Sequence, residues 1–372
     1  MKKIIYLSNS IIPSQFANSV HVMKMCQAFR SNSFDVQLLF YTKSKKINDE
    51  SIFLSYGINK KFKLIPMHIK STKKKFFQNI VNIYRFLNKN DRKTIVYGRD
   101  IYSVYLASLM GFDVYFESHG KPFTKIHEML ERSLYKKKKF KELIVISSRL
   151  KEIYIKDNYF IKEEKISVLH DGADSFDLEK DVIDLGEGFH IGYIGSLYYE
   201  GRGIDLILNL AKENQDLNFH LIGGKKDEIH YWKTKSTNNI KFHGFLPNNE
   251  AISFLTGFDV VLMPYQKDLN LDGMKYNTSD WMSPMKMFEY MSASKAIISS
   301  DLPVIREVLN NENSVLVEYD NKLAWNTALR GLHNNQDHLN KISIQASYDF
   351  NSKYTWNKRV QILKSSMENS LK

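Results

Sequence analysis

Short apolar runs alternate with longer helix-like segments along this chain, and the alternation starts again near residue 190. In the first half, buried strands are predicted at residues 3–7, 35–41, 94–97, 113–117 and 142–147, with helices near 18–31, 100–110 and 122–139. In the second half, strands are predicted at 190–194, 218–222, 240–242, 259–263 and 296–299, with helices at 203–213 and 284–294. Strands that alternate with helices form parallel sheets covered by helices. The pattern therefore predicts an α/β chain of two doubly wound units in tandem.

The length of 372 residues agrees with two domains, because most domains hold about 100–200 residues. An acidic stretch that is poor in long apolar runs, residues 175–187, separates the two halves. We therefore predict an N-terminal domain over residues 1–175, a linker over 176–187 and a C-terminal domain over 188–350. A final helix over 351–372 is expected to pack back toward the N-terminal domain.

Composition limits the class of protein. One cysteine, Cys26, excludes an intrachain disulfide framework and a cysteine-based metal site, and it favours a reducing compartment. No apolar run approaches the ~20 residues of a membrane span, and the apolar start of the chain is too short for a signal peptide. We expect a cytoplasmic protein that is soluble or peripheral on the inner face of the membrane.

Charge is distributed unevenly between the two halves. The formal net charge of +12 divides into +15 for residues 1–180 and −3 for residues 181–372. A basic half suggests an anionic partner, such as a membrane surface, a phosphorylated acceptor or nucleic acid. No nucleic-acid recognition motif accompanies the charge, and solvated lysine-rich helix faces remain the alternative.

A glycine-containing loop follows the predicted strand 190–194. The loop, Gly195–Gly203, leads into a helix and contains one arginine, Arg202. Backbone N–H groups at a helix start, together with a guanidinium, bind phosphate well. The loop lacks the spacing of the dinucleotide motif and of the P-loop. It is a candidate phosphate site, and an ordinary turn with a surface arginine is the alternative.

A second candidate site is the helix start near residue 284. Ser283 is expected to cap this helix and Pro284 to be its first residue. Lys286 and Glu289 lie three residues apart, on one face of the helix. A cation near the positive end of a helix is unfavourable unless an anion binds there too. Diphosphate beside Lys286 and sugar hydroxyls beside Glu289 explain the pair, and a surface salt bridge is the alternative.

Polar residues also follow two predicted strands of the first half, at the edge where parallel strands end. Arg99 and Asp100 come after the strand 94–97, and Glu117 and His119 come at the end of the next one. Ligands of parallel sheets bind at this edge. A further turn, Asp171–Asp174, precedes the linker. Each of these motifs is a weak signal alone.

The order of the motifs resembles that of the family 4 retaining glycosyltransferases of the GT-B fold, of the bacterial surface-polysaccharide type. The resemblance covers essentially the whole chain, and its most specific part follows Ser283. The matching segments are residues 8–30, 115–119, 147–150, 171–174, 195–203, 240–244 and 283–299. The resemblance implies a GT-B fold, in which two Rossmann-like, doubly wound domains face an interdomain cleft.

The resemblance also implies an activity. It implies retaining transfer of a sugar from a UDP- or GDP-sugar to a hydroxyl of a glycan or lipid-linked acceptor, in the synthesis of capsule, O-antigen or another surface polysaccharide. No cofactor, metal ion or nucleic acid is implied. Catalysis would depend on Arg202 and Lys286, which stabilise the departing diphosphate, and on His119, which reaches the donor sugar. The implied donor-binding residues are Gly195, Ser196, Arg202, Gly244, Phe245, Leu246, Ser283, Pro284, Lys286 and Glu289, and the acceptor-side candidates are Asn18, His21, Arg99 and Glu117.

The chain departs from the family pattern at three positions. Trp281, next to Asp280, stands where the family has the first glutamate of its E-x7-E motif. Ser196 replaces an arginine, and Arg202 matches the family's lysine only with a shift of one residue. Two alternatives therefore stay open: a nucleotide-sugar 2-epimerase and a non-catalytic nucleotide-sugar-binding protein. A Rossmann oxidoreductase is disfavoured, because the dinucleotide motif is missing.

Clustered lysines beside aromatic residues occur twice in the basic half, at residues 73–77 and 136–141. Lysines attract anionic lipids and phenylalanine can enter the membrane interface. We predict peripheral attachment of the N-terminal half to an anionic membrane.

Overall fold

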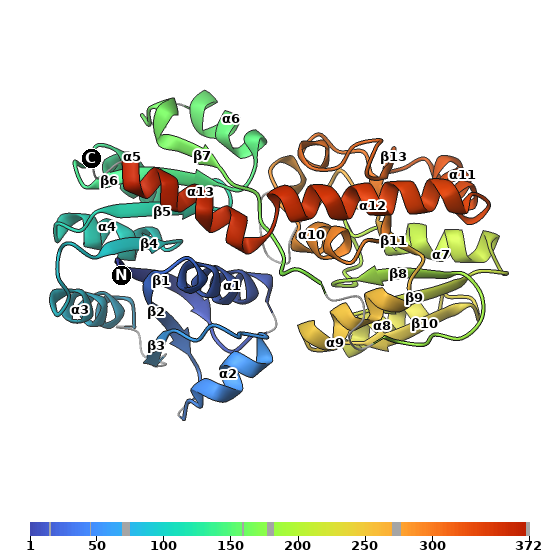
Figure 1. Cartoon of the computed structure of the whole chain (residues 1–372), viewed down its shortest axis with the longest axis horizontal. Helices are drawn as coiled ribbons and strands as arrows, with labels where there is room; N and C mark the ends of the chain where they lie inside the picture. The colour runs from blue at the N-terminus through green and yellow to red at the C-terminus, as the bar shows by residue number, and fades with distance from the viewer. Residues whose placement is uncertain are drawn as a thin grey trace. The chain divides into compact units, whose positions relative to one another are not determined.

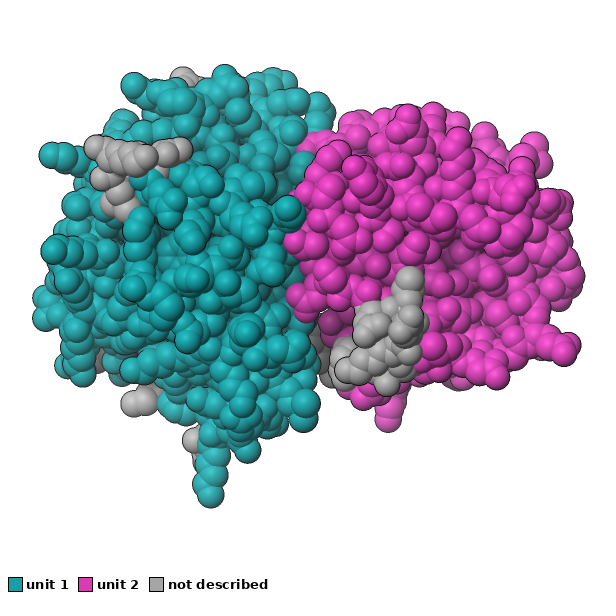
Figure 2. Space-filling view, in the orientation of Figure 1, with its two compact units in different colours: residues 1–170, 356–372 teal, residues 171–355 magenta. Residues whose placement is uncertain are grey.

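The protein is described by a computed structural model, which covers residues 1–14, 16–44, 46–68, 75–157, 160–176, 182–269 and 277–369. The chain divides into two compact units, one of residues 1–170 and 356–372 and the other of residues 171–355 (Figure 2). Each unit contains a parallel sheet whose strands alternate with helices along the chain (Figure 1). The predicted fold class, α/β with two doubly wound units, is confirmed.

The first unit is built on a seven-stranded sheet with the strand order β3-β2-β1-β4-β5-β6-β7. Its elements are β1 (Lys3–Ile11), α1 (Ala17–Ser31), β2 (Asp35–Thr42), α2 (Asp49–Ser55), β3 (Lys63–His68), α3 (Lys75–Asn88), β4 (Ile95–Gly98), α4 (Ile101–Leu109), β5 (Val114–Ser118), α5 (Lys125–Tyr135), β6 (Phe140–Val145), α6 (Ser148–Lys156) and β7 (Ile166–Val168), together with the last helix of the chain, α13 (Trp356–Asn369).

The second unit is built on a six-stranded sheet with the strand order β10-β9-β8-β11-β12-β13. Its elements are β8 (His190–Ile194), α7 (Ile204–Glu213), β9 (Asn218–Ile222), α8 (Lys226–Lys233), β10 (Ile240–Gly244), α9 (Asn248–Ser253), β11 (Val260–Met263), α10 (Met285–Ser292), β12 (Ala296–Ser300), β13 (Val315–Val317), α11 (Lys322–His333) and α12 (Gln336–Lys353).

The central strands are those that the sequence pattern predicts best. β4 and β5 are buried along their whole length, as expected for mostly apolar parallel strands that are covered on both faces. The edge strand β3 was not predicted. It contains Pro66, which interrupts the pattern and is tolerated because a proline that lacks an N–H can occupy an edge strand.

The carboxyl ends of the strands carry the candidate site residues. Arg99 follows β4, and His119 follows β5 in the first unit. In the second unit, the loop that begins at Gly195 follows β8, and Tyr265 comes soon after β11. This is the edge at which open parallel sheets bind their ligands.

Candidate functional site

A buried carboxylate ends β5 in the first unit. Glu117 is 1% exposed. The hydroxyl of Tyr97, on the neighbouring strand β4, donates a hydrogen bond to Glu117 Oε2. The second carboxylate oxygen, Oε1, receives the contacts of the basic side chains described next.

Two histidines converge on Glu117 Oε1. His119 Nε2 lies 2.6 Å from this oxygen and His21 Nε2 lies 2.8 Å from it. The two imidazole rings meet edge to face, with their centroids 4.8 Å apart. His21 is buried on α1, whereas 21% of the His119 side chain is exposed. Three of the residues singled out from the sequence therefore form one cluster.

The C-terminal helix α13 completes this cluster. Arg359 Nη2 lies 3.1 Å from Glu117 Oε1, and the ring of Trp356 packs edge to face on His21 with centroids 5.1 Å apart. A C-terminal helix that packs back was expected from the sequence, but no site residue was predicted on it. Arg359 lies on the same face of the helix as the buried residues Trp356, Val360, Leu363 and Met367. An arginine on an otherwise apolar helix face indicates a buried ion pair, and this pattern could have identified Arg359 from the sequence.

Glu117 is held as an anion. Burial raises the pKa of its carboxyl, but the charges of Arg359 and His21 and the hydrogen bond from His119 lower it further, so that the pKa lies well below its usual range. A carboxylate offers about four acceptor positions. Tyr97, His21, His119 and Arg359 each approach one of its two oxygens.

The other acceptor-side candidates lie near the same edge but outside this cluster. Asn18 is exposed in the first turn of α1. Arg99 donates its backbone N–H to the carbonyl of Leu7 at 3.2 Å. The Nη1 atom of Arg99 is buried, and no residue in the described part of the chain accepts a hydrogen bond from it.

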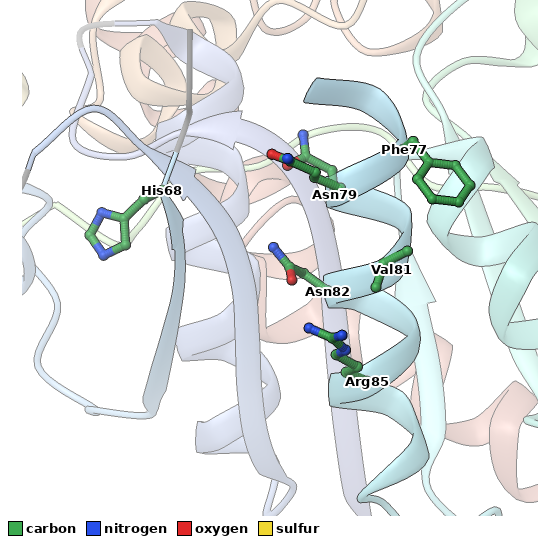
Figure 3. A pocket seen from close by; sticks show the side chains of 7 residues that line it. His68, Phe77, Asn79, Val81, Asn82 and Arg85 are labelled. Atoms are coloured by element: carbon green, nitrogen blue, oxygen red, sulfur yellow. The ribbon is translucent and has the colours of Figure 1, made fainter. Parts of the chain in front are cut away.

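A polar cavity of about 360 Å³ lies beside α3 in the first unit and was not predicted. Asn79, Asn82 and Arg85 point from α3 toward the side of β3, whereas Phe77 and Val81 lie on the opposite side of the helix (Figure 3). Amide and guanidinium groups on one helix face offer both donors and acceptors to a polar ligand. The complete lining is His68, Phe77, Gln78, Asn79, Val81, Asn82 and Arg85.

In the second unit, two cations lie against tyrosine rings. Lys286 Nζ is 3.9 Å from the ring centroid of Tyr193 and 5.4 Å from that of Tyr265. The guanidinium carbon of Arg202 is 5.4 Å from the centroid of Tyr265 and 5.6 Å from that of Tyr198. These are cation–π distances. Tyr265 therefore contacts both of the cations that the sequence analysis assigned to phosphate binding.

Neither cation is neutralised within the described residues. No carboxylate of the described segments lies within ion-pair distance of Lys286 or Arg202, and the buried Nε of Arg202 has no hydrogen-bond partner there. Burial, followed by the charge of Arg202, lowers the pKa of Lys286 well below its usual range. The charge of Glu289 raises this pKa, but by less. Two cations held together without an ion-pair partner among the described residues form a site suited to an anion such as diphosphate.

Gly195 provides the space that Lys286 occupies. It follows β8 with a φ of +155°, and a Cβ at this position would lie 2.5 Å from Lys286 Nζ. The next residue, Ser196, accepts a hydrogen bond at its carbonyl from the Tyr193 hydroxyl, at 2.9 Å. The loop therefore admits the ammonium group and orients the ring against which it lies.

The start of α10 differs from the prediction. Pro284 takes the N-cap position, and the helix begins at Met285. Ser283 was expected to cap the helix, but its Oγ instead accepts a hydrogen bond from the backbone N–H of Asp171, at 2.9 Å. The predicted cap is therefore wrong, because the turn that begins at Asp171 uses the hydroxyl.

The remaining donor-site candidates also lie in the second unit. Asn248 Nδ2 donates a hydrogen bond to Glu289 Oε1, at 3.2 Å. Gly244 ends β10, and its carbonyl accepts a hydrogen bond from the Gly223 N–H at 2.7 Å. Phe245 is half exposed, whereas Leu246 packs against the core of the unit. Trp281 is 5% exposed, so an indole is buried where the family pattern has a carboxylate.

The histidine–carboxylate cluster of the first unit is an ion-pair network. Arg359 lies on the same oxygen of Glu117 that both histidines approach. A guanidinium at this distance already balances the charge of the carboxylate. The absence of a bound metal ion stays a prediction.

Residues 188–335, which lie within the second unit, match the family model described as glycosyl transferases group 1. The matched segment contains Arg202, Lys286 and all the tyrosines that contact them. No curated protein matches the chain by sequence.

Solved structures of the GT-B fold resemble the whole chain. A glycosyltransferase from Rickettsia africae ESF-5 superposes with a TM-score of 0.74 and 14% identity, covering 100% of this chain and 99% of its own. Anabaena Alr3699/HepE in complex with UDP has a TM-score of 0.74 and 11% identity, covering 99% and 100%. The lipopolysaccharide outer core galactosyltransferase WaaB has a TM-score of 0.66 and 15% identity, covering 99% of each chain. The chain therefore has the GT-B fold.

Proposed function

We propose that the protein is a retaining glycosyltransferase that moves a sugar from a nucleotide-sugar donor to a hydroxyl of a glycan or lipid-linked acceptor. The observation that carries the proposal is the pair of cations, Arg202 and Lys286, that lie together on tyrosine rings and form no ion pair with a carboxylate of the described chain. The match of residues 188–335 to a glycosyltransferase model supports the same activity.

The donor binds to the second unit in this proposal. Arg202 and Lys286 hold the diphosphate, together with the backbone N–H of Ser196 and the N–H groups in the first turn of α10, which begins at Met285 after Ser283 and Pro284. Gly195 lines the site without donating, because its N–H is bonded to the carbonyl of Ile222. Glu289 accepts the ribose hydroxyls, and residues 244–246 contact the base. We expect a UDP-sugar, since one of the similar structures contains UDP, with a GDP-sugar as the next candidate.

Surface polysaccharide is the proposed product. One similar structure is a lipopolysaccharide galactosyltransferase, which supports a glycan or a lipid-linked glycan as acceptor. Asn18, Arg99 and the polar cavity beside α3 are its candidate contacts on the first unit. Asn82→Ala is expected to raise the acceptor KM without changing the donor KM. Tyr84→Ala, a change of an exposed neighbour on α3, is the control.

The activity is tested by incubating the protein with UDP- and GDP-sugars and candidate acceptors. The expected result is a glycoside whose anomeric configuration, read from the proton coupling at the new linkage, equals that of the donor. Release of an epimerised free donor would instead identify a 2-epimerase. Donor binding without turnover on any acceptor would identify a non-catalytic binding protein, to which the buried Trp281 points.

We also propose that the first unit contacts an anionic membrane. Lys73 and Lys74 lie outside the described residues, as do the side chains of Lys75 and Phe76. In the second cluster, Lys139 pairs with Asp113 at 3.2 Å, so part of its charge is used internally. No helix of the described residues is long and apolar enough to cross a membrane.

A better membrane-binding surface lies at α5. Phe123, Ile126 and Met129 are spaced three residues apart and are 53%, 57% and 62% exposed. Lys125, next to Ile126, is exposed as well. Apolar side chains with a basic neighbour bind to anionic interfaces, where each lysine contributes ~1 kcal/mol.

Liposome co-sedimentation tests this surface. Ile126→Ser with Met129→Ser should reduce binding to anionic vesicles, whereas Ile344→Ser, a change of an equally exposed isoleucine in the second unit, should not. Equal binding of both variants would contradict the proposed surface.

A further inference from the structure

The geometry points to a role for the C-terminal helix in the site: Arg359 and Glu117 are positioning residues for His119. Arg359 holds Glu117, and Glu117 holds His119 with its proton on Nε2, so that Nδ1 is the atom that accepts a hydrogen bond from a hydroxyl of the donor sugar. The inference deepens the proposed glycosyl transfer and rests on it.

The carboxylate selects the tautomer of His119. An ionised carboxylate only accepts hydrogen bonds. His119 Nε2 lies 2.6 Å from Glu117 Oε1, so this nitrogen carries the proton. In the neutral imidazole the other nitrogen, Nδ1, is then an acceptor. His119 is the histidine suited to the sugar, because 21% of its side chain is exposed, whereas that of His21 is 1% exposed.

Arg359 fixes the carboxylate through several contacts at once. Its Nη2 donates to Glu117 Oε1 at 3.1 Å and to the carbonyl of Leu169 at 3.1 Å. Its Nε donates to the carbonyl of His170 at 2.9 Å. A planar guanidinium serves these acceptors together in a way that a lysine ammonium does not. With 3% exposure, Arg359 is also the buried cation that balances the buried anion.

The groups that face Glu117 come from five elements. They are Tyr6 on β1, Tyr97 on β4, His21 on α1, Arg359 on α13 and His119 after β5. Burial, followed by the charge of Glu117, raises the pKa of both tyrosines well above its usual value, so Tyr97 remains a donor to the carboxylate. Arg359, His21 and His119 therefore stabilise the ionised form of Glu117, which is the form that selects the tautomer.

A second buried carboxylate provides a matched control. Glu142 on β6 is 7% exposed and accepts a hydrogen bond from Ser366 of the same helix α13, at 2.5 Å, and another from Ser167. Glu142 therefore ties α13 to the sheet, as Glu117 does, but no histidine contacts it in the structure's described segments. A loss of helix anchoring alone should appear equally in both variants.

The experiment uses the full-length protein labelled with ¹⁵N-histidine, with the His119→Gln spectrum identifying the signals of His119. In the wild type we expect the Nε2–H tautomer. In Glu117→Gln we expect a mixture of tautomers, a fall in kcat of about tenfold or more, and an unchanged donor KM. Glu142→Gln should keep the wild-type tautomer and kcat. Arg359→Lys should fall between the wild type and Glu117→Gln.

The outcomes separate the inference from the proposed function. A wild-type tautomer and kcat in Glu117→Gln, at an unchanged melting temperature, would overturn the inference, as would an equal loss in Glu142→Gln. A wild-type protein that converts no donor overturns the glycosyl transfer only, because the tautomer comparison still reports the role of Glu117. If Arg359→Lys fails to fold, the spectrum of Glu117→Gln alone tests the inference. Glu117→Gln keeps the contacts of Arg359 with the backbone.

Discussion

The two units hold their basic side chains in opposite ways. In the first unit, Arg359, His21 and His119 surround one carboxylate, Glu117, and the charges of Arg359 and Glu117 balance within the protein. In the second unit, Lys286 and Arg202 lie on tyrosine rings, with no carboxylate of the described chain in ion-pair distance. A balanced cluster keeps its geometry before any ligand binds, whereas an unbalanced cluster is stabilised when an anion binds. The difference suggests that the first unit orients and the second unit binds.

The largest effect is expected from the unbalanced pair. Lys286→Ala or Arg202→Ala should lower turnover by about two orders of magnitude or more, because each leaves developing diphosphate charge unpaired. Steady-state kinetics measure this, with Lys212→Ala, a change of an exposed lysine on α7, as the control. Near-normal turnover in both variants would remove the contrast between the two units.

The balanced cluster should give a different signature. His119→Ala is expected to lower turnover by about tenfold or more but to leave nucleotide affinity nearly intact, since the proposed diphosphate contacts belong to the second unit. Calorimetric titration with nucleoside diphosphate and an activity assay separate the two quantities. His338→Ala changes an exposed histidine and is the matched control. An equal loss of nucleotide affinity in His119→Ala would contradict this division of roles.

Nucleotide binding is expected to be coupled to proton uptake by Lys286 in the second unit, but not by Glu117 in the first. Burial and the charge of Arg202 lower the pKa of Lys286 in the free protein, and a bound diphosphate raises it again. The complex then binds more protons than the free protein, so nucleotide affinity should fall as the pH rises. Glu117 contributes nothing, because it is ionised in both states. Calorimetry in two buffers with different ionisation enthalpies measures the uptake.

The control for proton uptake is Lys286→Arg, which keeps the cation but does not titrate in this range. Uptake should disappear in that variant. Uptake that persists would assign the proton to another group.

The smallest effect concerns a histidine chain without a carboxylate. In the second unit His220 Nε2 lies 3.1 Å from His190 Nδ1, and His220 Nδ1 lies 3.0 Å from His243 Nε2. Burial, followed by His243 and His190, lowers the pKa of His220 from 6.5 to about 3. Between these values the unfolded chain binds a proton that the folded chain does not, so stability falls as the pH falls.

Urea unfolding measures this dependence between pH 7.5 and pH 5. The slope contributed by His220 should be at most about 1.4 kcal/mol per pH unit, and it should be smaller in His220→Gln. An unchanged slope in that variant would show that the chain of imidazoles does not remain neutral.

Local patterns explain which parts were predictable. The strands β4, β5, β8 and β9 are short and mostly apolar, and they are almost entirely buried. Arg202, Lys286 and His119 were singled out because each belongs to a short motif at a strand end or a helix start. Ser283 was predicted to cap α10, because a serine beside a helix start is typical of an N-cap. The sequence does not reveal that its hydroxyl accepts a hydrogen bond from the distant Asp171 N–H instead.

What the sequence by itself determined is the order of strands and helices, because hydrophobic periodicity depends on neighbours along the chain. Only the tertiary structure decided that Arg359 balances Glu117, 242 positions away in the chain, and that Tyr193 and Tyr265 lie against Lys286. No short-range pattern carries these contacts. They form because folding brings the ends of separate strands to one edge of a sheet. Once a charged group is buried there, its stability depends on the side chains that contact it.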